Sequence, residues 1–367
     1  MQPRRTTALL GALALTIALS SCTPAVATTT ALSASPTTVA LGRNVTLTAS
    51  VSAPSLGAAP AGSVTFSDGA VILGSRSLSG GVASLSTSAL APGTRTITAR
   101  FQPAAGSGYT TSSTTTIVSV QRFHLALGDS LAAGAGAPGG QGYVPLITGA
   151  QRSRLPGLAL RNLSCGGATS TSLLNGGGCS YPQGSQLAAA EAFLAANVGA
   201  VSFITIDIGA NDVSGCVSAS GADPACAAAR LPVVQSNLGQ IVQRLRAAAP
   251  GVPIVGMTYY NPFLAFWVVG NQAAAISANT AALTFNDALT ATYTAGGALV
   301  SPVEEAFGTE DAALTGSYLG TTVPQNVANI CAWTHMCSSF DIHANAAGHA
   351  LIAQTYGPVV TTAVPSG

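Results

Sequence analysis

The sequence contains no lysine, and all 13 of its basic side chains are arginines. Charged residues of both signs make up only 7% of the 367 residues, and the formal net charge is +1. Nucleic-acid binding depends on clustered positive charge that neutralises phosphates, and the sequence has no such cluster. The composition therefore predicts no nucleic-acid partner, and it excludes an acidic or basic tail.

The chain also lacks a hydrophobic run long enough to cross a bilayer, which takes about 20 apolar residues. Near the N-terminus, Arg4 and Arg5 precede an apolar stretch over residues 6–19, as in an export signal. Two endings compete, because residues 19–22 resemble a bacterial lipobox and residues 25–27 an ordinary cleavage site. We expect residues 1–21 to be a lipoprotein-type signal peptide, with lipid on Cys22 attaching an exported protein to a membrane surface. Free secretion is the alternative.

Cysteine is scarce, and the six cysteines after Cys22 fall into three close couples. Their spacings lack the C-x-x-C pattern of metal sites, and the histidines do not cluster with them. Disulfides are common in exported proteins, so we favour disulfides over a metal site. The grouping favours the sequential pairing Cys165–Cys179, Cys216–Cys226 and Cys331–Cys337.

Residues 28–121 contain no cysteine, and their pattern indicates an all-β domain. Short β-prone segments alternate with breaks rich in Gly, Pro and Asp, such as residues 67–69 and 91–93. Regular short strands of this kind predict a β-sandwich. Residues 62–69 and 92–99 resemble bacterial immunoglobulin-like (Ig-like) repeats of cell-surface proteins. Such a domain either contacts a cell-surface glycan or protein, or serves as a spacer.

From residue 122 to the end at residue 367, strand-like segments alternate with helical ones. This alternation predicts one large domain with a parallel sheet and helices on both faces. The expected strands are residues 123–127, 158–163, 201–208, 252–258 and 298–300. The expected helices are residues 186–197, 231–249, 272–294 and 346–355.

Ser130 is the best candidate for a catalytic nucleophile. It lies in Gly-Asp-Ser directly after the first strand of this domain, where α/β sheets place their reactive groups. An acyl-transfer serine needs hydrogen-bond donors for the oxyanion that forms on the substrate. Two later blocks offer them: residues 162–170, where Gly166 and Gly167 present backbone N–H groups without a side chain, and residues 208–212, with the side chain of Asn211.

His343 is the best candidate base among the four histidines. His124 lies inside a predicted strand, His335 lies in the short loop between two cysteines, and His349 falls within the last helix. His343 precedes that helix and has Asp341 two residues before it. A neighbouring carboxylate can hold the imidazole tautomer and stabilise the imidazolium.

The order of these four blocks resembles the GDSL, or SGNH, hydrolase family over residues 122 to about 360. The resemblance implies a three-layer α/β/α flavodoxin-like fold and ester hydrolysis with no metal or other cofactor. It implies Ser130 as nucleophile, with Ser130, Gly167 and Asn211 as oxyanion donors and His343 as base. The family usually places aspartate three residues before this histidine, where the chain has Phe340. Asp341 and a backbone carbonyl are therefore both left as groups that could orient His343.

The expected substrate is a lipid or other small ester, and the expected enzyme is a lipase or esterase. A carbohydrate O-deacetylase and a surface glycan-binding adhesin with an inactive hydrolase domain are the alternatives. Residues 263–269 are apolar and either line an acyl pocket or pack on the core. Trp333, shortly before His343, could also border the site.

Overall fold

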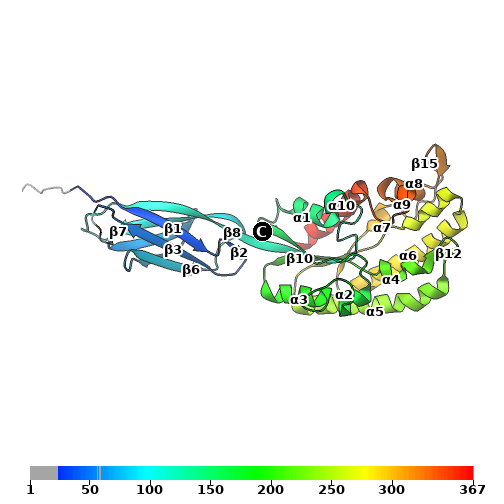
Figure 1. Ribbon diagram of the computed structural model, residues 1–367, viewed down its shortest axis with the longest axis horizontal. Coiled ribbons are helices and arrows are strands. Elements are labelled where there is room, and N and C mark those ends of the chain that lie inside the picture. The colour runs from blue at the N-terminus through cyan, green and yellow to red at the C-terminus, as the bar shows by residue number, and fades with distance from the viewer. Residues whose placement is uncertain (1–23, 56, 58, 367) are drawn as a thin grey trace, which may run out of the picture. The chain divides into compact units, whose positions relative to one another are not determined.

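The computed structural model describes residues 24–55, 57 and 59–366 (Figure 1). The predicted signal peptide and the predicted lipidation site at Cys22 lie outside the described residues. Within the described part, no helix combines the length and the hydrophobicity that a membrane span requires.

The N-terminal region is all β, which confirms the prediction from its turn pattern. Alternate side chains of its strands are buried, and Leu47, Phe66 and Ile97 are fully enclosed. One sheet has the order β1-β3-β6, and β8, β7, β4 and β5 are neighbours in another, with β2 pairing with β8. The strands are β1 (Thr29–Ser35), β2 (Thr38–Ala40), β3 (Val45–Ser52), β4 (Gly62–Asp68), β5 (Val71–Ser77), β6 (Val82–Thr87), β7 (Gly93–Pro103) and β8 (Ser112–Gly128).

Five parallel strands form the sheet of the C-terminal region, in the order β9-β8-β10-β13-β14. Counted along the chain from β8, this order is 2-1-3-4-5, as in flavodoxin-like folds. The new strands are β9 (Leu158–Asn162), β10 (Val201–Asp207), β13 (Ile254–Met257) and β14 (Leu299–Ser301). In such sheets, ligands bind outside the carboxyl ends of the strands where the order reverses, here between β8 and β10.

Helices cover both faces of this sheet, so the predicted α/β/α architecture is confirmed (Figure 1). One layer contains α1 (Tyr143–Gln151), α7 (Val303–Ala306), α8 (Gln325–Trp333) and α10 (Ala346–Ala363). The other contains α2 (Ser170–Asn175), α3 (Gln186–Ala196), α5 (Pro224–Ala248) and α6 (Gln272–Ala295). The shorter elements are η1 (Pro138–Gly140), α4 (Ala210–Val213), η2 (Ser214–Cys216), β11 (Val217–Ser218), β12 (Gly221–Ala222), η3 (Pro262–Val269), β15 (Gly316–Tyr318), β16 (Thr321–Val323) and α9 (Met336–Ser339).

Two helices are longer than the sequence predicted, and each contains a proline. The helix α5 begins seven residues before the predicted start at Leu231, because Asp223 caps it by accepting hydrogen bonds from the backbone of residues 225 and 226. It then continues through Pro232. The helix α10 continues past the predicted end at Thr355 and through Pro358. Proline normally ends a helix, so tertiary packing has overridden the local signal here.

The predicted boundary between residues 121 and 122 falls inside a single strand, β8. Residues 119–121 of that strand pair with β2, whereas residues 123–128 pair with β10. The division of the chain at this point therefore stays a prediction.

The three sequential disulfides are confirmed. Cys165–Cys179 closes the loop that follows β9, Cys216–Cys226 joins η2 to the first turn of α5, and Cys331–Cys337 links α8 to α9.

Replacing both Cys165 and Cys179 with serine should lower the free energy of unfolding. The disulfide closes a loop over a sequence separation of 14 residues. For such a loop the expected loss is about 3 kcal/mol, because the unfolded chain regains conformational freedom. Urea denaturation under oxidising conditions measures this loss. Ser180→Ala, an exposed change beside Cys179, is the control, and an unchanged midpoint in the double variant would contradict the expectation.

Candidate active site

Gly128 ends β8 and lets the chain turn sharply into Ser130. Its φ angle of 145° favours glycine, and a Cβ atom there would lie 1.5 Å from the Oδ1 atom of Asp207 on the adjacent strand. The Gln186 side chain accepts the Gly128 N–H at 2.7 Å and donates to its carbonyl at 3.0 Å. The hydrogen bonds to Gln186 therefore hold the end of β8, two residues before Ser130. The close approach of this strand end to Asp207 is possible only because residue 128 is glycine.

The structure brings Ser130, His343 and Asp341 together in one hydrogen-bonded chain. The Nε2 atom of His343 lies 2.8 Å from the Ser130 Oγ atom. The Nδ1 atom lies 2.5 Å from the Oδ1 atom of Asp341, which also accepts the backbone N–H of His343 at 3.0 Å. Partial burial acts to raise the pKa of Asp341, but these hydrogen bonds hold it below its ordinary value.

Backbone geometry explains how an aspartate only two residues before His343 reaches its ring. Phe340, which follows α9, has a left-handed backbone with a φ of 55°, and the chain turns there. The Tyr260 hydroxyl donates to the carbonyl of Ile342 at 2.8 Å, which fixes the same loop. The turn at Phe340 thus lets an aspartate two residues before the histidine, and not the usual three, reach the imidazole ring.

The rings of the other three histidines form hydrogen bonds with groups other than Ser130, as the sequence predicted for His124. The buried His124 ring lies 2.8 Å from the hydroxyls of both Thr148 and Thr205, and burial lowers its pKa to about 3. The Nε2 atoms of His335 and His349 lie 2.9 Å and 2.8 Å from the carbonyls of residues 136 and 135. Their rings support the segment after Ser130 and do not reach its hydroxyl.

Two of the candidate oxyanion donors, Asn211 and Gly167, lie in the segments that follow the two strands flanking β8. Asn211 lies in α4, directly after β10, and its amide donates to the Ala168 carbonyl at 2.9 Å. A primary amide carries two hydrogens, so this bond leaves one for a ligand. Gly167 lies on the exposed loop after β9, with a φ of 74°. That loop is joined to β8 by the hydrogen bond from the Cys165 N–H to the Gly128 carbonyl, 3.0 Å long.

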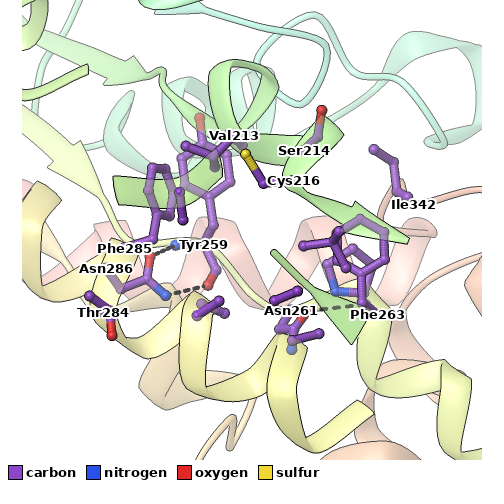
Figure 2. A pocket seen from close by; sticks show the side chains of 18 of the residues that line it. Val213, Ser214, Cys216, Tyr259, Asn261, Phe263, Thr284, Phe285, Asn286 and Ile342 are labelled. Atoms are coloured by element: carbon purple, nitrogen blue, oxygen red, sulfur yellow. Dashed lines mark hydrogen bonds between the residues drawn. The ribbon is translucent and has the colours of Figure 1, made fainter. Parts of the chain in front are cut away.

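An apolar cavity of about 560 Å³ adjoins the Ser130 side chain. Asn211, Tyr259 and His343 border it on the side of Ser130, and its remaining wall comes mainly from α5, α6, the segment from α4 to β11 and the start of η3. Figure 2 shows Tyr259, Phe263 and Phe285 around this space. Most of the lining residues on α5 and α6 are small or apolar, including Ala227, Ala228, Leu231, Ser277, Ala278, Ala281 and Ala282, and α6 also contributes the polar residues Thr280, Thr284 and Asn286.

The apolar segment 263–269 is divided between the cavity and the hydrophobic core. Phe263 lines the cavity, whereas Leu264 and Ala265 are buried in the hydrophobic core. Trp333 is not among the residues that line the cavity, and its ring instead packs edge-on against Phe307, with centroids 5.4 Å apart.

Several side chains that support the site were missed from the sequence: Gln186, Asp207 and Tyr259. The Tyr259 hydroxyl donates to the Oδ2 atom of Asp129 at 2.9 Å. Asn286 in turn binds both backbone groups of Tyr259, each at 2.8 Å (Figure 2). One signal was present, because Asp207 is the only charged residue of β10 and lies at its end.

Metal-ligating side chains do not gather at this site. In the part of the chain that the structure describes, no group of three or more His, Cys, Asp or Glu side chains is arranged to hold a metal ion. The site instead combines a hydroxyl, an imidazole, a carboxylate and an amide, which suits nucleophilic attack and proton transfer.

Comparisons with known proteins agree with this architecture. A model of the GDSL-like lipase/acylhydrolase family matches residues 126–351, and a model of the bacterial Ig-like domain (group 3) matches residues 32–121. No curated protein matches the chain. The first match covers more than half of the sequence.

Solved structures also align with the chain at low identity. An extracellular lipase from Streptomyces rimosus is 20% identical, with a TM-score of 0.46, and the alignment covers 66% of this chain and 100% of that one. A phospholipase A1 from Streptomyces albidoflavus is 18% identical, with a TM-score of 0.40 and the same coverage. The esterase EstA from a Pseudoalteromonas species is also 18% identical, with a TM-score of 0.38, covering 66% of this chain and 98% of that one.

The fold and the family matches define an ester-hydrolase-type α/β/α domain preceded by an Ig-like region. The chain belongs to the GDSL-like lipase/acylhydrolase family.

The Asp129→Asn variant should alter how stability depends on pH. Burial raises the pKa of Asp129 to about 6, so the folded state binds its proton more tightly than the unfolded state does. Its stabilising contribution is full below the unfolded pKa of about 4 and is lost as the pH rises through the folded pKa. The stability of the variant relative to wild type should therefore rise by about 2 kcal/mol from pH 4 to pH 8.

Chemical denaturation across this pH range measures the difference. Tyr259→Phe is the matched control, since it keeps the Asp129 carboxylate and removes a hydrogen bond that favours the ionised form. Its stability should fall with rising pH at least as steeply as that of wild type. A pH-independent difference between Asp129→Asn and wild type would contradict the expectation.

Proposed function

We propose that this protein is an exported carboxylic ester hydrolase, a lipase or esterase, in which Ser130 is the nucleophile and His343 the base. The observation that carries the proposal is the hydrogen-bonded chain Ser130–His343–Asp341 beside an apolar cavity. The disulfides and the Ig-like domain are compatible with an extracellular location. Lipid attachment at Cys22 and a surface ligand for the Ig-like domain remain predictions.

In the first step, the Ser130 hydroxyl attacks the ester carbonyl while His343 takes its proton at Nε2. The separation of 2.8 Å between these atoms is within the range for direct proton transfer. His343 then gives the proton to the leaving alcohol as the carbon–oxygen bond breaks, which leaves an acyl group on Ser130. Water, activated by the same imidazole, releases the acid and restores the hydroxyl.

The negative charge that forms on the carbonyl oxygen needs preorganised donors. We assign this role to the backbone N–H groups of Ser130 and Gly167 and to the Asn211 amide, which come from the ends of three adjacent strands. Fixed donors at such positions stabilise the transition state without any reorganisation cost.

Asp341 is the group that we propose to orient His343. Its carboxylate accepts from both the ring and the backbone of His343, which supports the carboxylate over a backbone carbonyl. The lowered pKa of Asp341 keeps it ionised at neutral pH, so it can stabilise the imidazolium that forms during each step.

The cavity favours esters of longer, apolar acids over acetyl esters. Its lining is predominantly apolar, and its volume of about 560 Å³ falls within the range of pockets that hold small organic ligands. An acetyl group would leave most of that surface without contacts, whereas an acyl chain would bury it. The volume and the apolar lining of the cavity therefore support a lipase or esterase over a carbohydrate deacetylase.

Replacing Ser130 with alanine should abolish hydrolysis of p-nitrophenyl esters and labelling by a fluorophosphonate. Removing the nucleophile of such a triad lowers kcat by on the order of 10⁶-fold, because no covalent intermediate forms. Ser214→Ala is the control, since Ser214 lines the same cavity and is outside the proposed triad. A Ser130→Ala protein that is labelled and active would refute the proposed function.

Filling the cavity should shorten the preferred acyl chain. The half-buried Ala281 lines the cavity from α6, so Ala281→Leu should lower kcat/KM for long-chain p-nitrophenyl esters by about 10-fold, with little effect on the acetate. Ala273→Leu, at an exposed position of the same helix outside the lining, is the control. An equal loss on all chain lengths would contradict an acyl-binding role, and activity confined to acetylated glycans would favour a deacetylase.

A further inference from the structure

Two acidic side chains, Asp129 and Asp207, are buried beneath the turn that carries Ser130. Asp129 is 2% exposed and Asp207 is fully buried. Neither is used by the hydrolytic steps above. Burying ionised carboxylates costs a large free energy unless a cation or several hydrogen bonds compensate, so their presence calls for a role.

The contacts of Asp207 point to the nucleophile turn. Its Oδ1 atom accepts the backbone N–H of Asp129 at 2.9 Å, and it occupies the space that a side chain at Gly128 would need. Asp129 and Gln186 complete the support, because the Asp129 Oδ1 atom accepts the N–H of Leu131 at 2.9 Å and Gln186 binds Gly128. Each backbone N–H of residues 128, 129 and 131 is thus held by a side chain.

None of the ion pairs among the described residues involves Asp207. Its Oδ2 atom is buried with no partner at hydrogen-bond distance, and the nearby Tyr143 hydroxyl and Ala132 N–H act to lower its pKa. The titratable groups that interact with it are Asp129, directly after β8, and five tyrosines: Tyr143, Tyr259, Tyr260, Tyr293 and Tyr356. Burial and the negative charge of Asp129 raise the pKa of Asp207 well above its ordinary value.

We propose that Asp207 is a positioning residue, held as the neutral acid, that fixes the turn of Ser130 through the backbone N–H of Asp129. This role rests on the proposed function of Ser130 as nucleophile. A neutral acid keeps one oxygen for the Asp129 N–H and adds no second negative charge beneath the site where an oxyanion forms. Small displacements of a reacting atom are costly, since an error of about 1 Å reduces the rate about 100-fold.

Two variants of Asp207 distinguish the role of its acceptor oxygen from any role of its charge. Asn resembles the neutral acid and keeps an oxygen that accepts the Asp129 N–H, so Asp207→Asn should retain kcat within about 3-fold. Ala removes the acceptor, so Asp207→Ala should lower kcat by about 100-fold and leave KM within about 2-fold, since the cavity is unchanged. Thr205→Val is the matched control, because it removes a buried polar contact on the same strand, to His124, and should lower Tm without lowering kcat.

Infrared difference spectra near pH 8 test the protonation state directly. At this pH Asp129, with a pKa of about 6, is ionised. The carbonyl band of a protonated carboxylic acid should be present in wild type and absent from Asp207→Asn. This measurement stands even if Asp207→Ala fails to fold.

Several results would overturn the inference. Loss of kcat in Asp207→Asn as deep as in Asp207→Ala would show that a neutral acceptor is not enough, and an infrared spectrum without the acid band would show that Asp207 is ionised. Wild-type kcat in Asp207→Ala would show that the turn needs no such support. Activity remaining in Ser130→Ala would instead refute the proposed nucleophile, so the two failures are distinguishable.

Discussion

The close approach of Gly128 and Asp207 is the constraint on which the rest of the site depends. These residues are direct neighbours in the register of two parallel strands, β8 and β10, at the point where the strand order reverses. The missing side chain at residue 128 leaves room for the carboxyl group at residue 207. Ser130 and Asn211 follow these two strands, so the spacing of adjacent strands sets the distance between the two residues.

The residues that we propose to react could be singled out because each lies in a short local pattern at an element boundary. Ser130 follows an apolar strand and His343 precedes a helix, and the sequence alone pointed to both. The supporting residues were not predictable in this way. Gln186, Tyr259 and Asp207 are distant from Ser130 in the sequence, and their roles follow only from the tertiary fold.

The fold shows the same division between local and tertiary causes. The alternation of strands and helices gave the α/β/α class and the five parallel strands, since hydrophobic periodicity is a local property. The ends of α5 and α10 were misplaced because packing carries both helices through a proline. The cavity could not be foreseen either, because it results from small residues that α5 and α6 bring to the same space.

The three disulfides have a consequence for how the chain reaches this fold. Six cysteines allow 15 pairings, yet every native partner is the nearest cysteine along the chain, at separations of 14, 10 and 6 residues. Short loops lose the least conformational entropy on closure, so random encounters already favour the native partners. The covalent pattern can therefore be completed couple by couple as the polypeptide emerges from N- to C-terminus, with little need for a disulfide isomerase.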